Sequence, residues 1–361
     1  MTVRPKTPLL DASLTRPDWL SSVPRREGLL WLDKNENTDP SLQQITERVL
    51  HEVGARGLST YPEFGELYRK LARWVEVSPD SLILTPGSDG AIRMAFEAFV
   101  TEGDRVVHTS PTFAMYSVYC KMFGASASLL YYENTAEGPA LATDAILAHL
   151  RRERPRLLCL PNPDSPTGTV LPPEELRAIV ELCAKQGCVA LIDEAYHPFY
   201  GHSCVRWTRE FENLVVARTF AKAWGLAGIR LGYAVGHPDT VRYFHKLRPM
   251  YEVSTIAAVV AERMLDFADE MQASVRRLNE GKSYFLQRME GLGFRTLHGE
   301  GNFLYVAFGR RAAAIHRALQ DRVLYRADSN EPCLKGYSRF SATTRERFQP
   351  LVEVIAGVTR D

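Results

Sequence analysis

Short apolar runs alternate with amphipathic segments along the middle of the chain. The runs at residues 81–84, 157–160 and 188–192 are brief and almost entirely apolar, which predicts buried strands. Between them, residues 65–75 and 172–186 repeat apolar positions every three or four residues, which predicts helices. Strands that alternate with helices build a mostly parallel sheet with helices on both faces. The middle of the chain therefore predicts an α/β fold.

The pattern changes after residue 238. Residues 239–292 predict almost continuous helix, and the short strands expected at 303–308, 323–325 and 337–341 predict a smaller α+β unit. Prolines and weak periodicity before residue 30 predict an arm. We therefore expect an arm with part of the small domain over residues 1–40, a large domain over 41–260 and a small C-terminal domain over 261–361.

Charge and composition narrow the classes of function. The formal net charge of +1 argues against an extended nucleic-acid surface. The chain has no apolar run long enough for a bilayer and no apolar signal-peptide core near its N-terminus, so we expect no membrane and a cytoplasmic location. None of the six cysteines forms a C-x-x-C pair, which favours reduced thiols and no metal site.

Lys222 follows the apolar strand expected at 214–217 and lies among small and apolar residues. Partial desolvation disfavours the ammonium form, so such an amine can act as a nucleophile toward carbonyls. Arg230 lies eight residues later and carries a guanidinium group suited to phosphate. The alternative is an ordinary lysine with a buried stem and a solvated head group.

Two further polar turns follow expected strands. Gly87-Ser88-Asp89-Gly90 joins a strand to a helix, so its amides could bind an anion, or its side chains could simply cap the helix. Asp193 ends an apolar strand, where a carboxylate is costly without a cationic partner. A protonated pyridine nitrogen would be such a partner; a metal ion or a helix cap are the alternatives.

The order of these motifs, with Asn162-Pro163-Asp164-Ser165-Pro166-Thr167-Gly168 and Asp193-Glu194-Ala195-Tyr196 between the turn and the lysine, resembles fold-type-I aminotransferases that use pyridoxal 5'-phosphate (PLP). The segments 35–37, 60–62 and 111–116 are similar to the histidinol-phosphate aminotransferase branch. The resemblance covers residues 29–345. It implies a large PLP-binding domain with a mostly parallel sheet and a smaller α+β domain.

The resemblance implies roles around the cofactor ring. Lys222 would form the Schiff base and then carry a proton between the substrate and the cofactor. Asp193 would pair with the ring nitrogen, Tyr196 would hydrogen-bond the ring hydroxyl and Phe113 would stack on the ring.

The resemblance also implies contacts at both ends of the site. Contacts to the cofactor phosphate are implied for Ser88, Asp89, Thr219, Arg230 and, from the other subunit of a homodimer, Tyr61. Arg339 would hold the substrate carboxylate. Arg326 matches a position that helps to bind a substrate phosphate, although it could be an ordinary rim arginine, and Asn35 belongs to the segment at the substrate entrance.

Three departures from the family pattern suggest a specialised biosynthetic enzyme. Ser165 and Ala221 stand where the family usually has asparagine and a hydroxyl residue, so two cofactor contacts are altered. Thr38-Asp39-Pro40 replaces the usual small residues at the entrance.

These features predict an aminotransferase acting on an amino acid or amino-phosphate and a 2-oxo acid. Two alternatives remain open: a PLP-dependent lyase, decarboxylase or dehydrating cyclase on the same fold, and a non-catalytic binding module.

Overall fold

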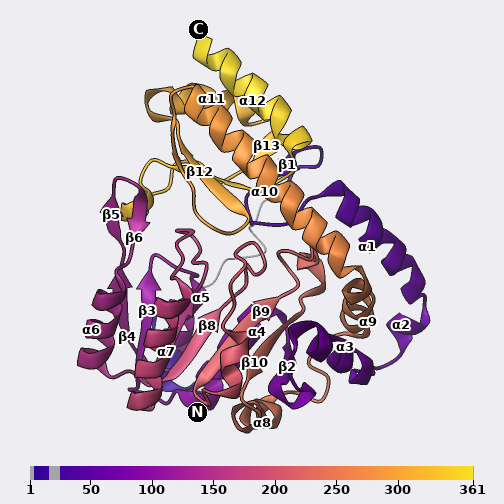
Figure 1. Ribbon diagram of the computed structural model, residues 1–361, viewed down its shortest axis with the longest axis vertical. Coiled ribbons are helices and arrows are strands. Elements are labelled where there is room, and N and C mark those ends of the chain that lie inside the picture. The colour runs from indigo at the N-terminus through magenta and orange to yellow at the C-terminus, as the bar shows by residue number, and fades with distance from the viewer. Residues whose placement is uncertain (1–3, 16–24, 361) are drawn as a thin grey trace.

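The computed structural model describes residues 4–15 and 25–360 (Figure 1). Within these residues, seven strands form the main sheet in the order β2-β10-β9-β8-β7-β3-β4. Strand β10 runs antiparallel to both of its neighbours, and the remaining pairs are parallel. The strands are β2 (Leu82–Thr85), β3 (Arg105–Ser110), β4 (Ser126–Tyr131), β7 (Leu157–Pro161), β8 (Val189–Asp193), β9 (Leu214–Thr219) and β10 (Gly232–Gly236). The mostly parallel sheet confirms the predicted fold class.

Alternate residues of the central strands enter opposite cores, because successive side chains of a strand point to opposite faces. On β8, Ala190 and Ile192 join one apolar cluster, while Val189 and Leu191 join another. The first cluster is covered by α1 (Pro40–Val53), α3 (Gly65–Val75), α6 (Thr143–Glu153), α7 (Pro173–Gln186) and α9 (Thr255–Met264). The second is covered by α4 (Gly87–Phe99), α5 (Met115–Met122) and α8 (Pro238–Leu247). Because both faces of these strands are buried, their sequences are nearly continuous apolar runs.

A smaller unit lies above the main sheet in Figure 1. Its three-stranded antiparallel sheet contains β11 (Arg295–Leu297), β12 (Phe303–Ala307) and β14 (Ser338–Ser341). Its helices are α10 (Ala268–Gly291), α11 (Ala312–Leu319) and α12 (Arg345–Arg360). Near the start of the described chain, β1 (Leu30–Trp31) pairs with β13 (Val323–Leu324), so the N-terminal segment joins this unit. The predicted domain limits at 40 and 260 stay predictions.

Some predicted elements differ from the structure. The expected loop at 57–64 begins inside a short helix, α2 (Arg56–Ser59), and the hairpin of β5 (Glu133–Thr135) and β6 (Gly138–Ala140) was not predicted. The helix expected over 239–292 is divided into α8, α9 and α10. The strand expected from residue 229 begins at Gly232, because Arg230 has a positive φ of 53° that a strand does not allow.

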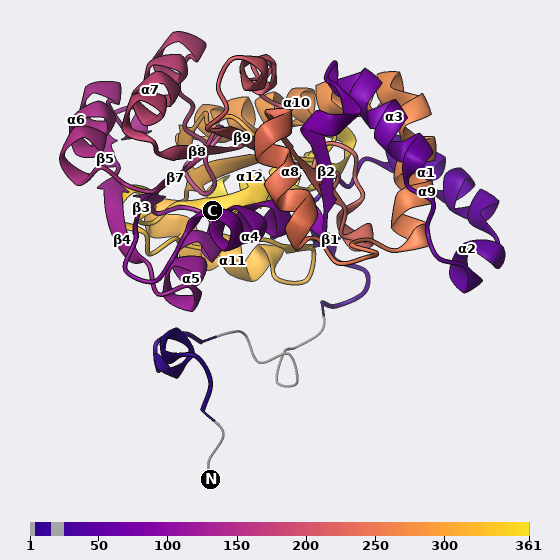
Figure 2. The ribbon, with the colours of Figure 1, turned by 90° about the horizontal axis from the view of Figure 1, so that it is seen from below.

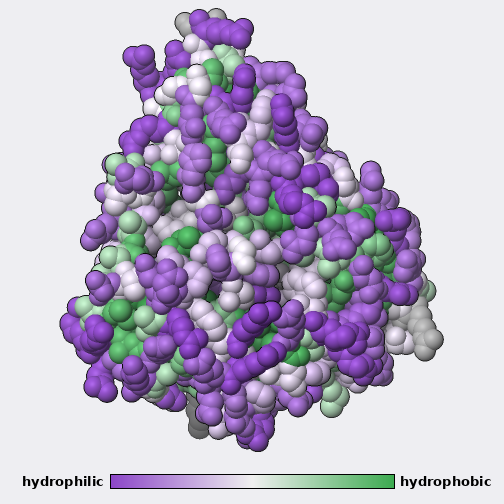
Figure 3. Space-filling model, viewed as in Figure 1, coloured by the Kyte–Doolittle hydropathy of each residue, from purple (hydrophilic) through white to green (hydrophobic). Residues whose placement is uncertain are grey.

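Residues 4–15 contain a short 3-10 turn, Thr7–Leu10, which lies beside α5 (Figure 2). The face of the molecule in Figure 3 is mainly hydrophilic, with small hydrophobic areas between charged residues. Within residues 4–15 and 25–360, no helix combines the length and apolar character needed to cross a membrane. All six cysteines are free, and all are buried.

Candidate active site

A cavity of about 170 Å³ lies where the central strands end at their carboxyl sides. This is the edge at which open α/β sheets bind their ligands. The cavity brings together nine of the residues predicted from the sequence: Ser88, Asp89, Phe113, Ser165, Asp193, Tyr196, Thr219, Lys222 and Arg230. Their assembly follows from strand register, since Pro161 lies opposite Asp193, and Asp193 opposite Ala217.

One end of the cavity is suited to an anion. Helix α4 begins at Gly87, and its first turn carries Ser88 and Asp89 into the cavity wall. A Cβ atom on Gly87 would lie 2.7 Å from Nη2 of Arg230, so this glycine lets the guanidinium approach the helix start. A Cβ atom on Gly232 would lie 2.3 Å from the carbonyl carbon of Gly87, so β10 also needs glycine here. The backbone amides at the start of α4 and the guanidinium group of Arg230 therefore lie at the same end of the cavity, where they form one anion subsite.

Thr219, the last residue of β9, is engaged with the backbone of this region. Its hydroxyl accepts a hydrogen bond from the amide of Ala221 at 3.1 Å and donates to the carbonyl of Leu231 at 3.4 Å. These contacts fix the turn that leads to Lys222. The structure therefore supports a positioning effect of Thr219, and its predicted contact with a phosphate stays a prediction.

Asp193 carries a buried carboxylate at the end of β8. Tyr116 donates its hydroxyl to Oδ2 at 3.0 Å, and the amide of Ala195 donates to Oδ1 at 3.0 Å. Burial raises the pKa of Asp193 from 3.8 to about 6, although both hydrogen bonds oppose this shift. The charged groups that act on it, Asp89 and Glu194, are also acidic. Among the described residues, this carboxylate therefore has no cationic partner to offset the cost of its burial.

The neighbouring carboxylate of Glu194 has such a cation. Arg218 donates to it through Nε at 3.0 Å and Nη2 at 2.8 Å, and both side chains are buried. Burial by itself would raise the pKa of Glu194, but the Arg218 guanidinium holds that pKa below its usual value. Adjacent acidic residues thus have different environments: Glu194 is neutralised within the protein, and Asp193 faces the cavity.

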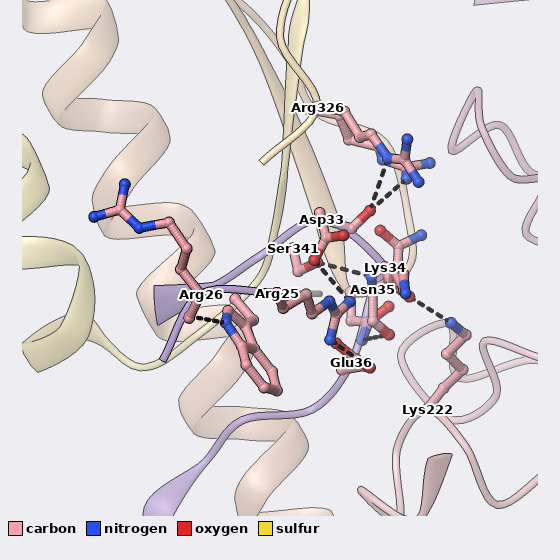
Figure 4. A network of polar contacts seen from close by, with 12 residues as sticks. Arg25, Arg26, Asp33, Lys34, Asn35, Glu36, Lys222, Arg326 and Ser341 are labelled. Atoms are coloured by element: carbon pink, nitrogen blue, oxygen red, sulfur yellow. Dashed lines mark hydrogen bonds and ion pairs between the residues drawn. The ribbon is translucent and has the colours of Figure 1, made fainter. Parts of the chain in front are cut away.

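Lys222 also lines the cavity wall. Its ammonium donates to the backbone carbonyl of Lys34 at 3.0 Å (Figure 4). It also lies 5.7 Å from the centre of the Tyr196 ring. The Tyr196 hydroxyl accepts a hydrogen bond from Nδ2 of Asn35 at 2.8 Å. The entrance segment therefore contacts both the lysine and the tyrosine, which places Asn35 beside the cavity, although it does not line it.

Phe113 and Ser165 form two further parts of the wall. Phe113 is 38 % exposed and contacts the ring of Tyr116 edge-on, with centroids 5.9 Å apart. Its predicted stacking on the cofactor ring stays a prediction. Ser165 follows Asp164, whose buried carboxylate accepts hydrogen bonds from Thr109 at 3.0 Å and from Tyr132. Burial raises the pKa of Asp164 to about 7.

Two arginines approach the entrance segment from the small unit. Arg326 and Arg339 pair through their backbones, and both side chains donate to the carbonyl of Asp33, at 3.3 Å from Nε and 3.1 Å from Nη2 respectively. In the described part of the chain, neither forms an ion pair with a carboxylate, and Nε of Arg339 is buried without a hydrogen-bond partner. Two guanidinium groups without a carboxylate partner among the described residues are suited to an anion. Their predicted contacts with the substrate stay predictions, and neither side chain lines the cavity.

Four predicted residues do not line the cavity: Asn35, Arg326, Arg339 and Tyr61. Tyr61 lies on the surface. Its side chain is 76 % exposed and stacks on Tyr251, with ring centroids 4.4 Å apart. Within one chain it does not line the cavity, and its predicted contact with the cofactor phosphate of another subunit stays a prediction.

Sequence reasoning missed Tyr116, Asp164 and the residues 33 and 34 that touch the arginines and Lys222. Tyr116 lies in the motif at 111–116 that was used only to narrow the family. Asp164 belongs to the predicted turn, so its position was available, but its burial was not.

Residues 27–355 match the family described as aminotransferase class I and II, and the chain belongs to this family. The histidinol-phosphate aminotransferase of Thermoanaerobacter sp. (strain X514) is 30 % identical over 319 residues, which cover 87 % of this chain and 89 % of that protein. The enzyme of the same name from Ruminiclostridium cellulolyticum is 27 % identical over 334 residues, covering 91 % and 92 %.

A solved structure has the same fold. The histidinol-phosphate aminotransferase of Sinorhizobium meliloti, solved in complex with pyridoxal-5'-phosphate, superposes with a TM-score of 0.80 at 23 % identity, covering 93 % of this chain and 92 % of that chain. The protein is thus a PLP-dependent aminotransferase of fold type I, as predicted. The cavity fits this cofactor, because it holds an anion subsite at α4, a buried carboxylate without a cation and an amine.

Proposed function

We propose that this aminotransferase moves an amino group between a 2-oxo acid and an amino acid or amino-phosphate that carries a second anionic group, in a specialised biosynthetic pathway. The observation that carries the proposal is the pair Arg326 and Arg339, directed at one carbonyl without a carboxylate partner among the described residues. The relatives named for histidinol phosphate, an amine that carries a phosphate, support an anionic substrate.

The residues that line the cavity would each have a separate role in cofactor binding or catalysis. When bound, PLP supplies an aldehyde that takes up the amino group and a ring that withdraws electrons from the reacting carbon. The Lys222 amine would hold the cofactor at rest and afterwards move the proton of the substrate α-carbon. Asp193 would keep the ring nitrogen protonated, and Arg230 with the α4 amides of Ser88 and Asp89 would bind the phosphate.

The remaining wall would orient the ring. Tyr196 would donate to the ring hydroxyl while it accepts from Asn35, and Phe113 would cover one ring face. Ser165 would contact the ring oxygen less directly than the asparagine usual in the family, because its side chain is shorter.

Substrate selection would depend on the two arginines of the small unit. The buried and unpaired Nε of Arg339 supports its predicted role as the partner of the substrate carboxylate. Arg326, which lies beside it, would contact the anionic far end, and Asn35 would border the entrance.

We also infer a homodimer with shared active sites. The exposed Tyr61 would reach the cofactor phosphate of the partner subunit, since it does not line the cavity of its own chain. We expect the enzyme to work in the cytoplasm, without a nucleic-acid or membrane partner.

A single-turnover experiment tests the proposal. The PLP-loaded enzyme would be mixed with a panel of amino acids that includes glutamate, arginine derivatives and histidinol phosphate, and the cofactor and products would be identified by mass spectrometry. We expect stoichiometric conversion of the cofactor to its amine form, with the matching oxo product, for a donor with a second anionic group. Arg339→Gln should lose this selectivity, because the glutamine cannot neutralise a carboxylate.

A cofactor that stays in its aldehyde form, with a substrate lighter by water or carbon dioxide, would contradict transamination and favour the lyase or cyclase alternative. Equal reaction of neutral and anionic donors would instead contradict the assignment of Arg326 and Arg339.

A further inference from the structure

Arg25 is held by two carboxylates at the entrance segment. Its guanidinium donates to both oxygens of Glu36, at 3.1 and 2.8 Å, and to Oδ1 of Asp33 at 2.7 Å. It also lies 4.9 Å from the centre of the Trp31 ring. The side chains of Arg25 and Asp33 are only 16 % and 9 % exposed, so this ion pair is largely protected from solvent. Such pairs are stronger than pairs on the open surface.

Asp33 is also the residue that meets the two substrate arginines. Its carbonyl accepts hydrogen bonds from Arg326 and Arg339, while its carboxylate is directed to Arg25. Figure 4 shows Arg326 and Arg25 on different sides of Asp33. Asp33 therefore neutralises Arg25 with its carboxylate. It offers Arg326 and Arg339 only its backbone carbonyl, which does not balance their charge.

This separation has an energetic basis. An aspartate that lost Arg25 would keep a poorly solvated negative charge next to two arginines that lack an acidic partner. Rotation of its side chain toward them would form the charge-assisted hydrogen bonds that carboxylates and guanidinium groups favour. The rotated carboxylate would occupy the place of the substrate's own anionic group and compete with it.

We propose that Arg25 is a positioning residue for substrate specificity: it holds the Asp33 carboxylate away from Arg326 and Arg339 and so keeps both arginines available to an anionic substrate. This inference rests on the proposed function, which assigns the two arginines to the anionic group. It adds a role for the N-terminal arm, because Arg25 lies outside the cavity and reaches the substrate only through Asp33.

The neighbouring arginine provides a matched control. Arg26 pairs with Asp321 at 2.8 Å, but both side chains are about two-thirds exposed, at 65 % and 64 %. Its side chain points away from the entrance segment in Figure 4. Removal of either arginine changes the net charge equally, yet the proposal predicts an effect for Arg25 alone.

The test measures the binding of glutarate and of inorganic phosphate to the PLP-loaded enzyme by calorimetry. Both probes carry the anionic charge of the substrate but cannot react. We expect Arg25→Gln to weaken binding by about tenfold, because an internal carboxylate now competes with the probe. Arg26→Gln should leave binding unchanged. Adding Asp33→Asn to Arg25→Gln should restore binding to within about threefold of wild type, since the amide keeps the shape without the charge.

The kinetic readout should agree with the binding. With the donor found by single turnover, Arg25→Gln should raise KM and leave kcat nearly unchanged, and the affinity for PLP should not change.

A loss of affinity that Asp33→Asn does not restore would overturn the proposal, because Arg25 would then only order the arm. Weak effects of Arg25→Gln together with a large effect of Arg339→Gln would also overturn it, while leaving the proposed function intact. No binding to the wild type, or no effect of Arg339→Gln, would refute the anion subsite and the inference with it.

Discussion

The carboxylate of Asp193 should destabilise the cofactor-free protein, and this can be measured with Asp193→Asn. The folded-state pKa of about 6 lies above the ordinary value of 3.8, because burial disfavours the charge. Between these two pH values the folded chain keeps a proton that the unfolded chain has lost. The free energy of unfolding therefore falls as the pH rises through this window.

The size of the effect follows from the two pKa values. They differ by about two units, and each unit corresponds to about 1.4 kcal/mol, so ionised Asp193 costs about 3 kcal/mol at neutral pH and above. The neutral amide of the Asp193→Asn variant would avoid this cost. It can keep both contacts, with its oxygen accepting from the Ala195 amide and its NH2 group donating to the Tyr116 hydroxyl.

The assay is urea unfolding of the cofactor-free wild type and Asp193→Asn at about pH 4.5 and pH 8. We expect the variant to be more stable at the higher pH by about 3 kcal/mol and by less than about 1 kcal/mol at the lower pH. The exposed Asp80 provides the control, because Asp80→Asn removes the same charge without a burial penalty. A variant no more stable than wild type at pH 8 would refute the burial argument.

The cofactor should reverse the order of stability. PLP would give the buried carboxylate its cation, so the wild type should gain more from cofactor than Asp193→Asn does. Loss of one partner of a buried charge pair costs about 2–5 kcal/mol, so PLP should bind the variant at least about 30-fold more weakly. Equal PLP affinities would contradict the pairing of Asp193 with the ring nitrogen.

Two further predictions concern the cofactor contacts. Ser165→Asn should tighten PLP binding about tenfold in equilibrium dialysis, because a hydrogen bond to a charged oxygen contributes about 1.5–3 kcal/mol, and it should move the pH-dependent colour change of the bound cofactor to lower pH. An unchanged affinity and colour transition would mean that serine already makes this contact. Mixing inactive Tyr61→Ala with inactive Lys222→Ala should restore activity, since one site of the mixed dimer would have both residues intact. Failure to recover activity after subunit exchange, verified by mass spectrometry, would argue against shared sites.

The cavity was the most predictable part of the molecule, for a physical reason. Its residues follow buried strands, and parallel strands bring their carboxyl ends to one edge whatever the details of packing. Asp193, at the end of β8, and Lys222, in the turn after β9, could therefore be placed together from the apolar runs before them. The local hydrogen bonds of Thr219 and the αL conformation of Arg230 depend on packing between β10 and α4 and could not be read in this way.

Contacts between distant segments were not predictable. The α2 helix is too short to carry a periodic signal. The three residues of β5 are exposed and polar, and β6 is the short segment Gly-Pro-Ala, so neither strand differs from a loop in its sequence. The backbone pairing of Arg326 with Arg339 depends on a single isolated bridge. Arg25 had no motif around it, and its importance appears only when Asp33, Glu36 and the substrate arginines lie together in space.

The entrance segment at residues 33–37 connects these distant parts. Through backbone carbonyls it contacts Lys222 on the large domain, by Lys34, and the arginines of the small unit, by Asp33. Asn35 adds a hydrogen bond to Tyr196 and adopts a positive φ of 56°, a conformation that asparagine tolerates better than most residues. Side-chain changes cannot remove the carbonyl groups. Substitutions can act here by removing the Asn35 hydrogen bond, by moving the backbone or by redirecting charge. The segment therefore contacts both Lys222 and the two arginines of the small unit. In the proposed role, Arg25 would act on the arginines through Asp33 without contact with Lys222.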